Sequence, residues 1–125
     1  MATFQTQQPN NTFLYLKVIV KANSLLYSRT VIMIYPGAVI ITESSPEASN
    51  GSIPPNKYSW YKLGRTADFV GKELNVDTLV SITNNVDITC SLVEDDDMNT
   101  PFINHSNYRL DDIVNNIARL SIAIN

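Results

Sequence analysis

Residues 76–93 read VDTLVSITNNVDITCSLV, and this stretch carries the clearest structural signal in the chain. Apolar and polar residues alternate on both sides of Asn84-Asn85, as expected for two β-strands joined by a turn. A two-residue loop at Asn84-Asn85 would place the apolar rows of the two strands on opposite faces. A three-residue loop over residues 83–85 instead pairs Val80 with Ile88, Thr78 with Cys90 and Val76 with Leu92. The sequence therefore predicts a β-hairpin with one dry face and one wet face.

Other segments show the same alternation. Residues 13–21, FLYLKVIVK, place Leu14, Leu16, Val18 and Val20 on one face, which predicts a half-buried strand. Residues 25–35, 38–42 and 57–63 are further apolar or aromatic runs bounded by turn residues. At the C-terminal end, residues 109–120 place Leu110, Ile113, Val114 and Ile117 at helical spacing, and the period changes to two from Ala118 onward. We expect a short helix followed by a terminal strand.

These elements predict an all-β fold, mainly an antiparallel β-sandwich or barrel of six to seven strands, with one short helix near the C-terminus. A chain of 125 residues fits one domain. Residues 1–12 are polar and lack charged side chains, so we expect a flexible N-terminal arm, with residues 13–125 forming a single β-rich domain. Two long loops are expected, at residues 43–56 and 94–107.

Composition narrows the function classes. The net charge of −3 argues against a nucleic-acid binder. Cys90 is the single cysteine, so an internal disulfide is impossible, and a small buried side chain is expected there. The sequence shows neither a secretory signal nor a run long enough to cross a membrane, so we expect no membrane partner. The sequence does not identify the compartment. For the viral component considered below, the virion or the host cytoplasm is the expected location.

Catalytic patterns are absent from the sequence. His105 is the one histidine, no nucleophile motif accompanies it, and the four glycines are scattered rather than grouped in a phosphate-binding loop. We therefore expect no enzymatic activity and no cofactor.

The run Glu94 to Asp97 is the sharpest local feature. Clustered carboxylates suit Ca²⁺, so Asp95, Asp96 and Asp97 form an alternative metal site. Against it, consecutive side chains of an extended chain point to different sides, and a solvated loop explains the same residues. The prediction is that no metal is bound.

Aromatic residues gather at Tyr58, Trp60 and Tyr61. Tyr58 and Trp60 would share one face of a strand and Tyr61 the other. An exposed pair would offer a platform for a sugar ring or a partner protein, whereas a buried pair would be a core anchor. Both interpretations remain open from the sequence.

The leading functional hypothesis is a structural or assembly subunit that acts through protein–protein contacts, as a homo-oligomer or in a larger complex. A phage or viral virion component, such as a capsid decoration protein or a tail or neck adaptor, would fit. The arm and the apolar strand at residues 25–35 would make the contacts, with Phe4, Phe13, Tyr15, Tyr27 and Tyr35 as interface candidates. The alternative is a carbohydrate-binding β-sandwich module that uses Tyr58, Trp60 and Tyr61, with Ca²⁺ as a possible aid.

Overall fold

The computed structural model describes residues 2–21, 28–37, 39–44, 60–80, 87–97 and 101–125. Within these ranges the chain forms ten strands and one short 3-10 helix. They are β1 (Ala2–Phe4), β2 (Phe13–Lys21), β3 (Ser28–Tyr35), β4 (Val39–Ser44), β5 (Tyr61–Arg65), η2 (Thr66–Asp68), β6 (Glu73–Val80), β7 (Asp87–Asp95), β8 (Asn104–Arg109), β9 (Asp112–Val114) and β10 (Ile117–Ile124).

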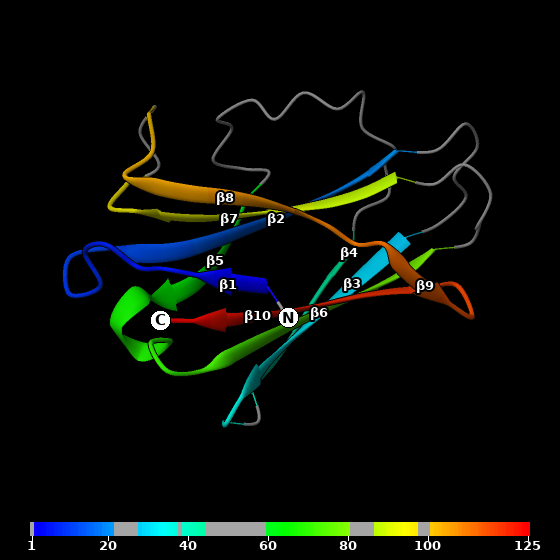
Figure 1. The fold of residues 1–125 in the computed structure, drawn as a ribbon, viewed down its shortest axis with the longest axis horizontal. Helices are drawn as coiled ribbons and strands as arrows, with labels where there is room; N and C mark the ends of the chain where they lie inside the picture. Colours follow the sequence, from blue (N-terminus) through cyan, green and yellow to red (C-terminus); the bar gives the residue numbers. More distant parts are fainter. Residues whose placement is uncertain (1, 22–27, 38, 45–59, 81–86, 98–100) are drawn as a thin grey trace.

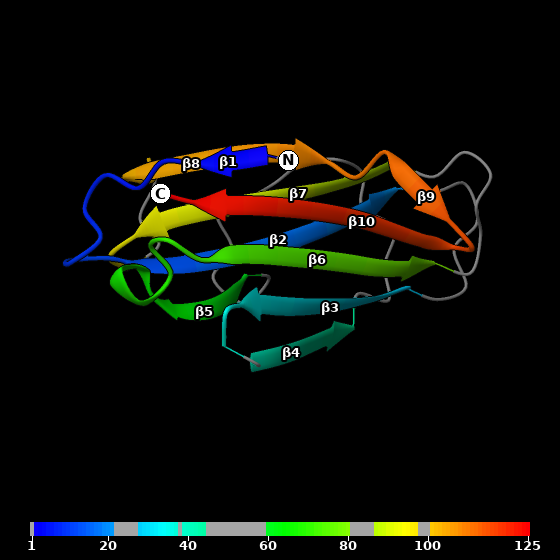
Figure 2. The same cartoon turned by 60° about the horizontal axis from the view of Figure 1, so that its bottom comes forward.

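The strands form two sheets. The larger sheet has the order β1-β10-β6-β3-β4, with β9 also paired to β10, and the smaller has the order β5-β2-β7-β8. All pairs are antiparallel except β1 with β10, which run parallel. Figure 1 shows the sheets as two layers, and Figure 2 shows the strand order of the larger one. Among the described residues neither sheet closes on itself, so the barrel alternative is not what forms.

One apolar core lies between the two sheets. It takes the inward row of nearly every long strand, because alternate side chains of a strand point to the same face. The buried members are Phe4, Leu14, Leu16, Val18, Ile32, Ile34, Phe69, Leu74, Val76, Ile88, Cys90, Leu92, Leu110, Ala118, Ile122 and Ile124. The predicted inward rows of residues 13–21 and of the C-terminal strand are thus confirmed where the structure describes their side chains.

The predicted hairpin of residues 76–93 is wrong in its pairing. β6 pairs with β10 and β3 in the larger sheet, whereas β7 pairs with β2 and β8 in the smaller one. The residues expected on the dry face are nevertheless buried wherever the structure describes their side chains, because Val76 on β6 and Leu92 on β7 enter the same core from opposite layers. Alternation fixed which side chains point inward, and the core between two sheets satisfies that pattern as well as a hairpin would. The predicted turn at residues 83–85 lies outside the described residues.

The predicted C-terminal helix is also wrong. Residues 104–124 form β8, β9 and β10, and Leu110 is the point at which the chain passes from the smaller to the larger sheet. The backbone N–H of Leu110 donates to the Ile88 carbonyl at 2.9 Å as this crossing is made. Asn115 and Asn116 connect β9 to β10 with φ of +53° and +67°, the pattern of a two-residue type I′ hairpin turn. An Asn-Asn pair thus forms the tight turn at residues 115–116.

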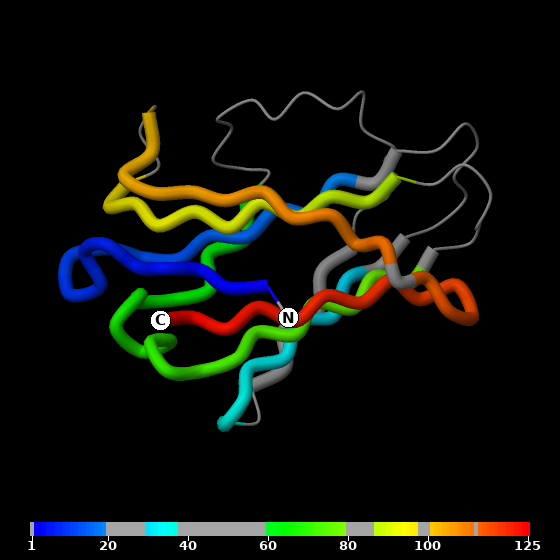
Figure 3. Tube along the Cα trace, viewed as in Figure 1, coloured from blue at the N-terminus to red at the C-terminus, as the bar shows by residue number. Residues whose placement is uncertain are grey.

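The N-terminal segment is part of the domain in this structure, which corrects the expectation of a flexible arm. β1 pairs with β10, and Phe4 is buried in the core. The backbone N–H of Thr6 donates to the Asn125 carbonyl, and that of Asn125 to the Phe4 carbonyl, each at 2.9 Å. Figure 3 shows the first strand beside the last one. One large aromatic side chain and a set of backbone hydrogen bonds are enough to fix a segment that is polar by composition.

The remaining boundaries differ in detail from those expected. β2 has the predicted bounds, and β3 lies within its predicted run. β4 and β5 overlap their predicted runs and each extend two residues beyond the predicted end. Residues 25–27, 38 and 57–59 of these runs lie outside the described part. The predicted loop at residues 94–107 is shorter, because β7 continues to Asp95 and β8 begins at Asn104. In the predicted loop at residues 43–56, residues 43 and 44 belong to the end of β4. The rest of this loop lies outside the described residues. No helix in the described residues is long and apolar enough to cross a membrane.

Candidate functional site

A second apolar cluster lies on the outer face of the smaller sheet. Tyr15 on β2 stands directly opposite Val93 on β7, and Trp60, just before β5, packs with both. Phe13 and Phe102 cover the edges of this group. The Trp60 and Phe102 rings meet edge to face with centroids 5.8 Å apart, a favourable aromatic geometry.

For Trp60, this cluster decides between the two interpretations of the aromatic pair. Trp60 is only 7% exposed, so it is a packed anchor rather than an open platform. Tyr61 pairs with Leu16 on the inward row and is half-buried, on the opposite face from Trp60 as expected. Tyr58 lies outside the described residues. The stacking surface that a carbohydrate module would need is therefore not offered by Trp60.

Two lysines border the aromatic cluster. Lys62 Nζ lies 3.8 Å from the centroid of the Phe13 ring, and Lys17 Nζ lies 6.0 Å from that of Trp60. Partial burial lowers the pKa of Lys17, because the charged ammonium loses water there. Burial raises the pKa of Tyr15, and the negative charges of the neighbouring acidic residues add to this effect.

The five interface candidates have different positions. Phe4 is in the core, Tyr15 is buried in the outer cluster, and Phe13 is half-buried there beneath Lys62. Tyr27 lies outside the described residues. Tyr35 is 49% exposed at the end of β3 and is the one candidate that the structure places on the surface.

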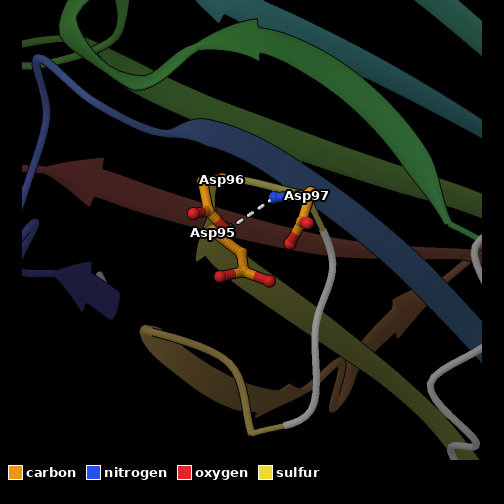
Figure 4. Close-up of side chains that lie close together, drawn as sticks. All are labelled: Asp95, Asp96 and Asp97. Carbon is orange, nitrogen blue, oxygen red and sulfur yellow. Dashed lines mark hydrogen bonds between the residues drawn. The ribbon is translucent and has the colours of Figure 1, made fainter.

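The acidic run ends β7. Asp95 is the last residue of the strand, and the chain bends at residues 96–97. Because of this bend the three side chains do not diverge as an extended chain would require, and one carboxylate oxygen from each lies within 4.8 Å of the others. Figure 4 shows the three side chains and the hydrogen bond from the Asp97 N–H to Asp96 Oδ1, which is 2.8 Å long.

Glu94 forms a polar site that was not predicted from the sequence. Its side chain continues the inward row of β7 and is completely buried. Its carboxylate accepts hydrogen bonds from the backbone N–H groups of Gln7 (2.8 Å) and Gln8 (2.6 Å), from Asn104 Nδ2 (3.0 Å) and from Thr12 Oγ1 (3.1 Å). The one available signal was an acidic residue at an inward position of an alternating strand.

The outer face of the larger sheet carries exposed apolar side chains at both ends. Val114, Ile117 and Leu79 are direct cross-strand neighbours on β9, β10 and β6, and Val114 and Leu79 are 60% and 40% exposed. Tyr35 lies at the other end of this face and lines a shallow groove with Pro36, Gly71, Lys72, Glu73, Ala123, Ile124 and Asn125.

No protein family model, no curated protein and no solved structure matches the chain.

The one cysteine and the one histidine do not meet. Cys90 points into the core, where burial raises the pKa of its thiol, so the thiolate nucleophile is disfavoured. His105 is exposed on the other face of the smaller sheet, opposite Val93, with its ring edge to face against Phe102. A cysteine–histidine pair of the catalytic type is therefore not assembled by these two residues.

Proposed function

We propose that the protein is a non-enzymatic assembly subunit: a β-sandwich that joins copies of itself, in a homo-oligomer or a larger complex such as a virion. In a virion the fitting roles are those of a capsid decoration protein or of a tail or neck adaptor. The observation that carries this proposal is the distribution of exposed apolar side chains. Of the four large ones that the described residues expose, Tyr35, Leu79 and Val114 share the outer face of the larger sheet.

This face resembles a contact surface in its arrangement. Val114, Ile117 and Leu79 form one apolar row across three strands, and Val31 and Met33 lie half-buried on β3 between that row and Tyr35. Apolar patches of this kind on a small protein mark contact sites more often than isolated apolar residues do. Tyrosine is enriched at interfaces because its ring is apolar and its hydroxyl can still bind water or a partner.

The middle of the same face is polar and internally paired. Arg119 Nε lies 3.7 Å from Asp77 Oδ2, and Ser121 Oγ donates to Asn75 Oδ1 at 2.5 Å. Cross-strand pairs such as these leave few polar groups that lose their partners when the surface is covered. The Ser121–Asn75 hydrogen bond can therefore be kept when another subunit covers the face.

The experiment is a measurement of mass in solution by light scattering over a range of protein concentrations. Tyr35→Ser, Leu79→Ser and Val114→Ser are expected to lower the mass, each by removing apolar area from the contact. Val70→Ser is the matched control, because Val70 is 44% exposed but lies in the turn after η2 rather than in a strand. A monomeric wild-type protein up to about 100 µM, or an equal loss of mass in the Val70 variant, would contradict the proposal.

Deletion of residues 1–12 would not test this proposal. Phe4 belongs to the core, and the backbone of Gln7 and Gln8 satisfies the Glu94 carboxylate. Removing the segment would destabilise the subunit itself, so any loss of assembly would have two causes.

A further inference from the structure

The end of β7 carries two successive carboxylates that are both buried but differ in their partners. Glu94 faces inward and accepts four hydrogen bonds, whereas Asp95 faces outward and is 1% exposed, and no residue in the described part of the chain forms a hydrogen bond with its Oδ2. A buried carboxylate oxygen without a donor is costly, because it has lost its water and received nothing in exchange. Such an atom indicates a missing partner.

The surroundings of Asp95 indicate the charge of that partner. One oxygen each from Asp95, Asp96 and Asp97 lie within 4.8 Å of one another, and among the described residues none of the three forms a salt bridge. Three carboxylates at this separation repel one another unless a positive charge lies between them. Figure 4 shows the Asp95 and Asp97 carboxylates beside each other, while Asp96 accepts from the Asp97 backbone.

We propose that Asp95, Asp96 and Asp97 bind a divalent cation of the Ca²⁺ type at the end of β7. Oxygen ligands lie about 2.3–2.6 Å from Ca²⁺, so two ligands of one ion can be at most about 5 Å apart. The observed limit of 4.8 Å falls inside that range. Mg²⁺ holds its ligands at about 2.0–2.1 Å and would need the three side chains to draw closer together. Asp95 supplies the buried ligand, and Asp96 and Asp97 supply exposed ones, with the remaining positions left to water.

The electrostatic effect of these residues extends to a neighbouring aromatic side chain. Phe13 stands opposite Asp95, and Tyr15 opposite Val93, so Tyr15 and Asp95 are diagonal neighbours on the outer face. The three aspartates contribute to the raised pKa of Tyr15, after burial itself. This position also gives the experiment a reporter, because tyrosine and tryptophan transfer excitation energy to a Tb³⁺ ion bound nearby.

The experiment is a titration of the whole protein with Tb³⁺, followed by displacement of Tb³⁺ with Ca²⁺ and with Mg²⁺. We expect saturable luminescence and a Kd for Ca²⁺ of about 0.1–1 mM, the range of sites built from few carboxylates. Asp97→Asn removes an exposed ligand and is expected to weaken binding at least tenfold. Asp68→Asn removes the same charge from an exposed position on η2 and is the matched control, with affinity expected within twofold of wild type.

A second readout separates a cation ligand from a purely structural carboxylate. Without metal, Asp95→Asn is expected to raise the melting temperature, because a neutral amide is easier to bury than an unpartnered carboxylate. With 10 mM Ca²⁺, the wild-type protein is expected to gain several degrees and Asp95→Asn none. Any of three results would overturn the proposal: no saturable Tb³⁺ signal, equal affinity in Asp97→Asn and wild type, or equal losses in Asp97→Asn and Asp68→Asn. Oligomeric mass measured in EDTA tests the assembly role separately.

Discussion

Glu94 offers the strongest test of how the N-terminal segment is held. Its carboxylate is fully buried and binds two consecutive backbone N–H groups, those of Gln7 and Gln8. A Glu94→Gln substitution keeps the size and shape of the side chain but replaces one acceptor oxygen with an NH₂ donor. The substitution therefore tests the hydrogen bonds without opening a cavity.

The magnitude follows from the two possible orientations of the new amide. With nitrogen at the Oε2 position, the Thr12 hydroxyl can turn its proton to the Gln8 carbonyl, 2.8 Å away, but the Gln8 N–H is left facing a donor. With nitrogen at the Oε1 position, the Asn104 amide can rotate, but the Gln7 N–H is left facing a donor. Either orientation strands one partly buried backbone N–H, at about 1–3 kcal/mol, and weakens the other bonds by removing the charge. We expect a loss of about 2–4 kcal/mol in the free energy of unfolding.

The assay is urea unfolding at neutral pH, read by circular dichroism. With an m-value of about 2 kcal/mol/M, the midpoint is expected to fall by about 1–2 M. Glu73→Gln makes the same chemical change at a half-buried position on the outer face of β6 and is expected to shift stability by less than about 0.5 kcal/mol. In the Glu94 variant, hydrogen exchange at the Gln7 and Gln8 amides should accelerate more than exchange in β2. Equal midpoints in the two variants, or exchange of those two amides as slow as in wild type, would contradict this role of Glu94.

Two further predictions concern the turn and the thiol. Asn116→Val should lower the free energy of unfolding by about 1–2 kcal/mol, because a β-branched residue is strained at the φ of +67°. Asn116→Gly should be neutral or stabilising. Equal urea midpoints for the two variants would rule out the type I′ turn. Cys90 should react with Ellman's reagent only after denaturation, since its side chain is fully buried and burial raises the pKa of its thiol. Reaction of the native protein within minutes would show that the core opens.

The sequence predicted the inward rows of the strands more reliably than it predicted their neighbours. The alternation in residues 13–21 correctly placed Leu14, Leu16 and Val18 in the core. The alternation in residues 76–93 was equally informative about burial and misleading about pairing. Alternation with a period of two shows which face of the strand a side chain occupies. It does not show whether two strands bury their apolar faces as neighbours in one sheet or as members of two sheets packed against each other. Strand order depends on contacts distant in sequence, such as β2 with β7, and a local pattern does not contain them.

In the C-terminal region, four apolar residues have helical spacing although the segment forms strands. Leu110, Ile113, Val114 and Ile117 have helical spacing, yet Leu110 is buried, Ile113 packs partly against the core, and Val114 is the most exposed large apolar residue described. A helix would have placed all four on one face. The deciding feature was Asn115-Asn116, since two adjacent residues that tolerate positive φ favour a tight β-turn over a helix interior.

The candidate sites were predictable in composition and not in geometry. Acidic residues at the end of β7 and aromatic residues near β5 were visible in the sequence. The sequence did not show that the chain bends after Asp95, which brings the three carboxylates together, or that Trp60 is covered by Phe102. The surface that supports the assembly proposal was missed except for Tyr35, because Leu79 and Val114 were expected in a hairpin and a helix.

Glu94 and Asp95 together explain why a cation belongs at one and not at the other. They are adjacent on one strand, so the alternation of β7 sends one carboxylate inward and the next outward. The inward carboxylate contacts the N-terminal segment, whose backbone N–H groups stabilise its charge by donating hydrogen bonds. The outward carboxylate is equally deprived of water, but the next two residues, Asp96 and Asp97, are themselves acidic, and none of the described residues supplies a donor to its Oδ2. A buried negative charge that the described residues leave unsatisfied is most simply balanced by an ion, and the two exposed aspartates beside it are suited to hold one.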